Sequence, residues 1–187
     1  MYILHDGPPR DPRPENEEAV YRFLEEHRIP FRRIDHEPVH TMEDCLAIDR
    51  ALGGEICKNL VLCNSQKTKF YLLMIQETKQ FKTKDVSKQL GVSRLSFATA
   101  EDMQRILHIA PGAVSPMGLI FPSAGDVQLV MDEDVKEAPR LGCHPCVNTA
   151  SIRIEMKDFF EAFLPAIGKS PAFVQIPHPD AAPEVCK

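Results

Sequence analysis

The chain has 187 residues, enough to bury the core of one domain of ordinary size. Hydrophobic residues make up 43% of it and charged residues 26%, a balance typical of a folded globular protein rather than a disordered one. The formal net charge of −5 argues against a sequence-independent nucleic-acid binder, whose affinity comes largely from neutralised phosphates. It still permits an enzyme that grips one end of an RNA with a local basic patch.

Targeting signals and cysteine usage indicate the compartment. No stretch approaches the ~18 apolar residues of a membrane span, and the opening MYILHDGPPRDPRP has neither the basic nor the apolar region of a signal peptide. We therefore expect a cytoplasmic protein without a membrane partner. The six cysteines, at positions 45, 57, 63, 143, 146 and 186, are accordingly interpreted as reduced thiols.

The apolar pattern predicts helices and strands that interleave without a regular βαβ period. Residues 1–14 hold four of the sixteen prolines and are interpreted as an irregular lead-in. The predicted helices begin at Glu15, at a cap on Thr41 and at a cap on Thr99, and two more cover 83–90 and 158–164. The predicted strands cover 31–36, 57–63, 70–76, 95–98, Gly118–Phe121, 127–131 and 151–155.

These elements predict the fold class. We expect one α+β domain over residues 15–168, built around a mixed, partly closed, barrel-like β-sheet that is flanked by helices. Residues 169–187 form a predicted Pro-rich C-terminal tail.

The segment His36–His40 (HEPVH) matches the letters of the H-E-x-x-H zinc-protease motif. That motif requires a helix, which places both histidines on one face. Pro38 removes a backbone donor and favours an extended chain, in which the two histidines would lie ~13 Å apart at ~3.3 Å per residue. We therefore reject the zinc interpretation.

The segment Cys143–Cys146 (CHPC) is a C-x-x-C motif with a histidine inside it. A structural zinc site needs about four ligands, and the sequence offers no second pair at related spacing. A redox role would normally place the motif before a helix, whereas a strand is predicted to follow. We therefore interpret these cysteines as small buried residues that hold His144 in place, and we expect no metal and no cofactor.

Three features remain as candidates for chemistry. Lys58 and Asn59 interrupt the apolar run EICKNLVLC, where Lys58 either meets an anion or lies at a sheet edge with its head in water. The loop Gly112–Pro116 (GAVSP) can aim backbone N–H groups at a carbonyl oxygen, although a plain connector would look the same. His144 can orient a water, a hydroxyl or an amino group, or it can be structural. Ser115 is a poor nucleophile candidate, because a proline follows it directly.

The order and identity of these segments resemble the YbaK and prolyl-tRNA-synthetase-associated editing domain family, and within it the freestanding alanyl-prolyl-tRNA deacylases. The resemblance runs from about Glu15 to about Leu164. Its matching segments are HEPVHTMED, ICKNLVL, KFYLLMI, KDVSKQLGVSRLSFATAEDM, GAVSPMGL and CHPCVNTASIRI.

The resemblance implies a trans-editing hydrolase that removes alanine from mischarged proline tRNA without a metal, by attack of a water assisted by the free ribose hydroxyl. Lys58 then contacts the terminal adenosine or its phosphate, the backbone at Gly112 and Ala113 binds the substrate carbonyl, and His144 is a pocket histidine. Further expected substrate contacts are Thr41, Asn59, Ser115, Pro116 and Asn148.

Such an enzyme needs a surface that binds RNA. The sequence also permits other functions. Its expected partners are the acceptor end of an aminoacylated tRNA and prolyl-tRNA synthetase. Lys79, Lys82, Lys84 and Lys88 are candidate tRNA contacts around one short helix, although charge runs are often only solvated. The alternatives are a deacylase of cysteinyl-tRNA(Pro) or another small aminoacyl-tRNA, and a non-catalytic module that binds tRNA or an amino acid.

Overall fold

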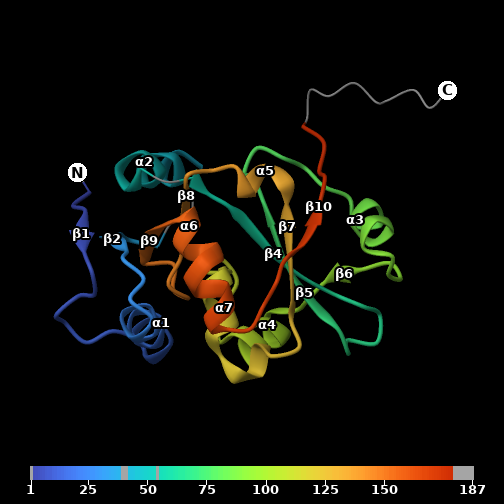
Figure 1. Ribbon diagram of the computed structural model, residues 1–187, viewed down its shortest axis with the longest axis horizontal. Coiled ribbons are helices and arrows are strands. Elements are labelled where there is room, and N and C mark those ends of the chain that lie inside the picture. The colour runs from blue at the N-terminus through green and yellow to red at the C-terminus, as the bar shows by residue number, and fades with distance from the viewer. Residues whose placement is uncertain (1, 39–41, 54, 179–187) are drawn as a thin grey trace.

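The computed structural model describes residues 2–38, 42–53 and 55–178 as a single α+β domain with two mixed five-stranded sheets (Figure 1). Helices cover the sheets, as the sequence predicts. The first sheet has the strand order β1 (His5–Asp6), β2 (Arg32–Asp35), β9 (Ala150–Glu155), β8 (Arg140–Cys143) and β3 (Glu55–Ile56). The second has the order β10 (Ala172–Val174), β7 (Gln128–Asp132), β5 (Phe70–Ile75), β4 (Lys58–Cys63) and β6 (Ser96–Phe97).

The structure has a helix in each region where the sequence predicts one, and local cap signals explain the limits of two of them. The side chain of Thr99 caps α4 in a full capping box with Asp102, and Gly91 ends α3 in the left-handed conformation. The helical elements are α1 (Glu15–Glu26), α2 (Met42–Leu52), α3 (Thr83–Leu90), α4 (Ala100–Leu107), the 3₁₀ turns η1 (Pro116–Ile120) and η2 (Pro122–Ala124), α5 (Glu133–Lys136), α6 (Met156–Asp158), the π-helical η3 (Phe159–Phe163) and α7 (Leu164–Ala166).

The expected barrel-like closure is wrong. Each sheet is open, with β1 and β3 at the edges of the first and β10 and β6 at the edges of the second. Most pairings inside the first sheet are antiparallel, and β3 contributes only two residues before the chain leaves it. So short a strand cannot carry the pairing further around a barrel, which needs staggered strands along its whole circumference.

Short strands extend both sheets beyond the predicted domain limits. The lead-in contributes β1, which pairs antiparallel with β2, and the tail contributes β10, which pairs parallel with β7. The strand expected at Gly118–Phe121 is instead part of the 3₁₀ turn η1, because the side chain of Ser115 accepts a hydrogen bond from the Met117 amide and Pro116 favours a helical start.

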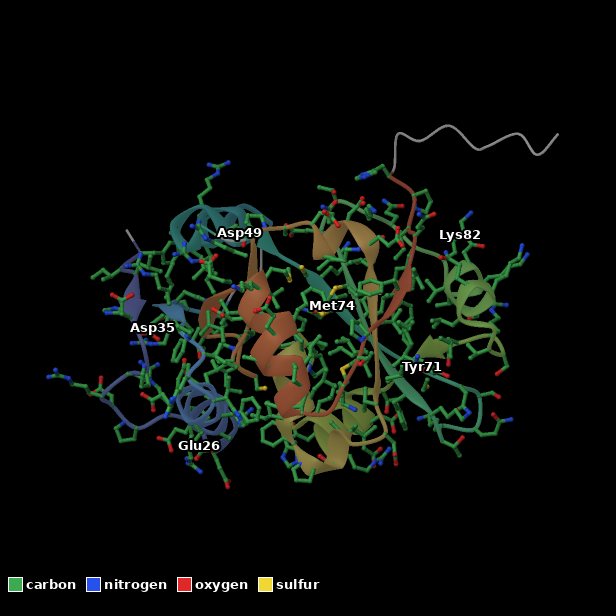
Figure 2. All side chains as sticks on the ribbon, viewed as in Figure 1. Glu26, Asp35, Asp49, Tyr71, Met74 and Lys82 are labelled. Carbon is green, nitrogen blue, oxygen red and sulfur yellow. The ribbon has the colours of Figure 1, made fainter. Side chains whose placement is uncertain are left out.

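One apolar core joins the two sheets. Met74, near the centre of Figure 2, is fully buried in the same cluster as Leu72 of β5 and Leu141 and Ile152 of the first sheet. Phe159 of the C-terminal helix is buried in this cluster too. A smaller cluster covers the other face of the second sheet beneath α3 and residues 174–176. The two faces of β4 therefore look into different environments.

A buried ion pair connects the end of β7, in the second sheet, with the turn that follows β5. The Lys79 ammonium lies 2.7 Å from Asp132 Oδ2 and 2.5 Å from Asp134 Oδ2, and Lys79 and Asp132 are 2% and 1% exposed. Burial by itself lowers the pKa of Lys79, but hydrogen bonds to the two aspartates outweigh it and raise that pKa. Asp132 also accepts a hydrogen bond from the Ile176 amide, which holds the C-terminal segment against β7.

Among the described residues, no helix combines the length and the apolar character needed to cross a membrane.

Removing the Lys79 ammonium should destabilise the fold strongly. We expect Lys79→Met to lower the free energy of unfolding by about 3–5 kcal/mol, because it leaves the buried Asp132 carboxylate without its partner. Urea unfolding followed by circular dichroism measures this. Lys136→Met is the matched control, since its ion pair with Glu137 is exposed and should contribute about 1 kcal/mol or less. Equal effects of the two substitutions would contradict the prediction.

Candidate active site

The chain passes from the first sheet to the second at Cys57. The strand β3 ends at Ile56 and β4 begins at Lys58, so this one residue joins the two sheets. A cavity of about 180 Å³ opens beside it, and its walls are Cys57, Asn59, Gly112, Val114 and His144. The structure thus brings together three residues that the sequence singled out separately.

Gly112 lines this cavity, and its backbone amide is unpaired among the described residues. Its φ of +87° is a conformation that L-residues with a side chain rarely adopt, so the loop requires glycine here. The Gly112 amide has no hydrogen-bond acceptor within the described part of the chain. The Ala113 amide, in contrast, donates to the Ala110 carbonyl at 3.1 Å. The expectation that both amides bind a substrate carbonyl is therefore corrected, since only the Gly112 N–H is available.

Asn59 also lines this cavity. Its Nδ2 donates to the Cys57 carbonyl at 3.0 Å, which fixes the amide plane. Its Oδ1 is buried and has no hydrogen-bond partner among the described residues. A buried acceptor left unpaired costs about 1–3 kcal/mol, so a hydrogen-bond donor that reached this atom would recover that cost.

His144 supplies a second acceptor. Its Nδ1 lies 2.9 Å from the Ala150 carbonyl and therefore carries the proton of the neutral ring, which leaves Nε2 as the acceptor. Burial is the main cause that lowers the pKa of His144 below its ordinary 6.5; the bond to Ala150 opposes this and the nearby His36 adds to it. The ring is thus neutral at physiological pH and behaves as a hydrogen-bond acceptor.

His36 and Ser151 lie beside His144 and are linked to it by hydrogen-bonding contacts. The sequence by itself predicted a role for neither residue. The His36 Nε2 lies 2.9 Å from Ser151 Oγ, which is fully buried and lies 3.4 Å from His144 Nδ1. The two imidazole centres are 6.0 Å apart. The signal was present in the HEPVH segment, where rejection of a zinc site left His36 without a role. His40 of that segment lies outside the described residues.

Lys58 does not enter the cavity. Successive strand residues point to opposite faces, so Lys58 lies on the face away from Asn59. Its side chain is exposed, and its Nζ donates to the Lys79 carbonyl at 3.4 Å. The expected grouping of Lys58 with Gly112 and His144 in one pocket is therefore wrong, because the strand alternation separates them.

Three other expected contacts are explained by packing. Ser115 is fully buried, where it caps η1 and bonds to Cys143, and Pro116 and Ala113 are buried too. A fully buried hydroxyl cannot touch a substrate, so the prediction for Ser115 is corrected. Asn148 remains beside the cavity, with its Nδ2 3.9 Å from where a Cβ on Gly112 would lie. Thr41 lies outside the described residues.

The cysteines of the CHPC segment are buried thiols. Burial raises the pKa of Cys143 to about 12, against a smaller lowering by the Ser115 hydrogen bond, and burial raises the pKa of Cys146 well above 9.0. Thiols with such values remain protonated and unreactive at physiological pH. Within the described part of the chain, no group of three or more His, Cys, Asp or Glu is arranged to hold a metal ion.

The four candidate lysines near α3 divide into two kinds. Lys79 is buried in its ion pair and cannot reach a phosphate, so its assignment as a tRNA contact is corrected. Lys82, Lys84 and Lys88 are exposed along α3. Figure 2 shows Lys82 at the outer side of α3, far from Asp49 on α2 at the other end of the molecule.

Comparison with known proteins identifies the family. Residues 36–162 match the model of the aminoacyl-tRNA editing domain. The chain belongs to this family. It is 30% identical over 141 residues to the prolyl-tRNA editing protein ProX of Acetoanaerobium sticklandii, covering 75% of this chain and 86% of that protein. It is 31% identical over 142 residues to the prolyl-tRNA synthetase associated domain-containing protein 1 of Mus musculus, covering 74% and 83%.

A solved structure shares the fold. The crystal structure of a candidate trans-editing enzyme for prolyl tRNA synthetase superposes with a TM-score of 0.65 at 20% identity, over 88% of this chain and 98% of that one. The family model and the two relatives confirm the resemblance to the editing-domain family that the sequence motifs indicate. The matched residues 36–162 include all five walls of the cavity, so the family relationship and the cavity concern the same part of the molecule.

The neutral state of His144 leads to a pH-dependent stability. Because the native pKa is lowered, the unfolded chain binds more protons than the native protein between that pKa and 6.5. The free energy of unfolding should therefore increase with pH across this window and lose that contribution as the pH falls through it. Urea unfolding from pH 4.5 to 7.5 measures the slope, and NMR of the imidazole ring gives the native pKa. In His144→Asn this part of the slope should vanish; an unchanged slope would contradict the assignment.

Proposed function

We propose that this protein hydrolyses the ester of a mischarged aminoacyl-tRNA, with alanine on proline tRNA as the substrate. The observation that carries the proposal is the polarity of the small cavity. Its walls include Gly112, whose backbone amide is an unpaired donor among the described residues, the side-chain amide of Asn59, and His144, whose Nε2 is an acceptor. An aminoacyl ester presents the complementary set, a carbonyl oxygen that accepts and an α-ammonium group that donates.

The geometry suggests how the reaction is assisted. The Gly112 N–H can stabilise the oxyanion that forms when water attacks the ester carbonyl, while Asn59 holds the α-ammonium group. A neutral His144 can accept a hydrogen bond from the ammonium group or from the water. Ser115 is not a candidate nucleophile, because it is fully buried and caps η1. The water is then activated by the ribose hydroxyl beside the ester, and the protein contributes orientation and electrostatics.

The volume of the cavity favours a small amino acid. At about 180 Å³ it lies below the ~300–1,000 Å³ typical of ligand pockets, so it can hold an alanyl group but not a whole aminoacyl-nucleoside. A synthetase pocket sized for proline rejects alanine poorly, since a missing methylene is worth only about 1–3 kcal/mol. A second, smaller site that admits alanine and excludes proline would supply the missing discrimination.

The tRNA and the synthetase enter as proposed partners. The ProX relative is named for prolyl-tRNA editing and the mouse relative for a prolyl-tRNA synthetase associated domain, which supports proline tRNA as the carrier and the synthetase as an associate. Lys58 lies just outside the cavity and is proposed to contact the backbone of the acceptor end. The exposed Lys82, Lys84 and Lys88 are proposed as further phosphate contacts, and the salt dependence of KM tests them.

Deacylation of charged proline tRNA tests the function directly. We expect release of alanine well above the spontaneous rate and little release of proline; a cysteinyl substrate run in parallel separates the rival specificity. Asn59→Ala should lower kcat/KM for alanyl-tRNA about 10–100-fold, the effect of losing a hydrogen bond to a charged group. Gln128→Ala, which removes an exposed amide at the start of β7, is the matched control. Binding of tRNA without hydrolysis would contradict the proposal and favour a non-catalytic module.

Enlarging the cavity should relax its selectivity. Val114 forms one wall, and Val114→Ala removes two methyl groups from it. We expect hydrolysis of prolyl-tRNA(Pro) to increase about 10-fold or more relative to alanyl-tRNA(Pro), because a methylene-sized change in an apolar wall is worth 10-fold or more in discrimination. The measurement is the ratio of the two kcat/KM values. If the ratio is unchanged, Val114 does not set the size limit.

A further inference from the structure

The loop over residues 144–149 joins β8 to β9 and contributes His144 to the walls of the small cavity. Asn148 belongs to the same loop, and its Nδ2 lies 3.9 Å from where a Cβ on Gly112 would be. In the middle of the loop, Cys146 has a φ of +65°, a left-handed conformation that residues with a side chain rarely adopt. Such a conformation persists only where neighbouring contacts hold it.

Asn16, in the first turn of α1, makes a contact of this kind. Its Nδ2 donates to the Cys146 carbonyl at 3.0 Å and to the His108 carbonyl at 2.9 Å. Its Oδ1 accepts a hydrogen bond from the Glu17 amide at 3.0 Å, which fixes the side chain at the start of the helix. His108, which ends α4, is left-handed too, with a φ of +56°. One side-chain amide thus binds the carbonyls of two left-handed residues.

Other contacts hold the far end of the loop. The His36 amide donates to the Thr149 carbonyl at 2.9 Å, and the His144 ring donates to the Ala150 carbonyl. Both of these contacts lie close to the point where β9 begins at Ala150. The bond from Asn16 differs from them, because it reaches the middle of the loop from a separate helix.

We propose that Asn16 is a positioning residue for the reaction: by holding Cys146 in the left-handed conformation, it keeps His144 and Asn148 at the small cavity. This inference rests on the proposed function. The residue acts through the loop and does not itself line the cavity. It also lies outside residues 36–162, which match the family model, so α1 contributes to the site from outside the matched segment.

The physical reason lies in the backbone of Cys146. When the bond from Asn16 is lost, the strain at Cys146 is relieved by rotation to a negative φ. His144 comes two residues before this point and Asn148 two residues after it, so the rotation moves one relative to the other. Glycine has no Cβ and adopts a positive φ about as readily as a negative one. A glycine at position 146 should therefore make the bond from Asn16 unnecessary.

Deacylation of alanyl-tRNA(Pro) by a set of folded variants tests the proposal. Asn16→Ala should lower kcat/KM about 10-fold, the effect of one hydrogen bond on a local equilibrium. Adding Cys146→Gly should restore kcat/KM to within about threefold of the unaltered protein. Adding Cys146→Ala should not, because alanine removes the same thiol but keeps the Cβ. Adding His108→Gly should not restore it either, since that change relieves only the end of α4.

Two further variants serve as a safeguard and a control. Asn16→Asp keeps the acceptor for the Glu17 amide but cannot donate to Cys146, so it repeats the test if Asn16→Ala does not fold.

Asn64→Ala is the matched control. Asn64 holds the turn between β4 and β5 through Thr68 and the Lys69 amide, and Lys67 in that turn is also left-handed, with a φ of +53°. The turn does not line the small cavity, so kcat/KM should change less than twofold.

NMR of the His144 imidazole without substrate separates this proposal from the proposed function. Asn16→Ala should shift the ring resonances, and the added Cys146→Gly should return them to their native positions. If alanyl-tRNA is hydrolysed but folded Asn16→Ala keeps its kcat/KM and its ring resonances, or glycine and alanine at position 146 restore activity equally, the positioning role is refuted and the function stands. If the resonances respond as expected but no ester is hydrolysed, the role of Asn16 in placing His144 stands and the function fails.

Discussion

The crossing of the backbone from one sheet to the other at Cys57 is the constraint on which the rest of the structure depends. Because β3 and β4 belong to different sheets, the residues on either side of Cys57 are held by two separate hydrogen-bonding networks. Cys57 itself is buried in the apolar core that joins the sheets. It is also a wall of the small candidate cavity and of a second cavity of about 540 Å³.

Polarity inside the small cavity is set by burial as much as by residue type. His144 is kept neutral because its surroundings exclude water, and the Ala150 carbonyl decides which nitrogen carries the proton. Ser151 and His36 stand behind the ring and limit its rotation. Asn59, another wall of the cavity, has a buried side-chain oxygen with no hydrogen-bond partner among the described residues.

Lys58 and Lys79 show how two lysines near one strand take different roles. Lys79 is buried between Asp132 and Asp134 and serves the fold, while the carbonyl of the same residue accepts the Lys58 ammonium. The same turn contributes Gln76, Glu77 and Thr78 to the walls of the second cavity. Lys58 is thus held outside the small cavity, with its side chain exposed.

The amino-acid sequence by itself determined the helices with strong local caps, the strands of β-branched and aliphatic residues, and the family. The capping box at Thr99 and the left-handed glycine after α3 are local features, so they were predictable. The Gly112 loop and His144 were ambiguous on their own residues, and the resemblance to the editing-domain family joined them into one candidate site. The sequence indicated what the Gly112 loop and His144 can do chemically, but not how they are arranged in space.

Only the tertiary structure decided which of these residues meet. Because side chains alternate along a strand, Asn59 lines the cavity and Lys58 does not. Ser115 caps η1 and is buried in the core. Lys79, a candidate phosphate contact in the sequence, is buried in a structural ion pair. His36 contacts Ser151, which lies 115 residues away in the sequence. The open sheets and the short strands β1 and β10 likewise depend on long-range pairing. Such contacts depend on how the sheets pack, which local sequence patterns do not encode.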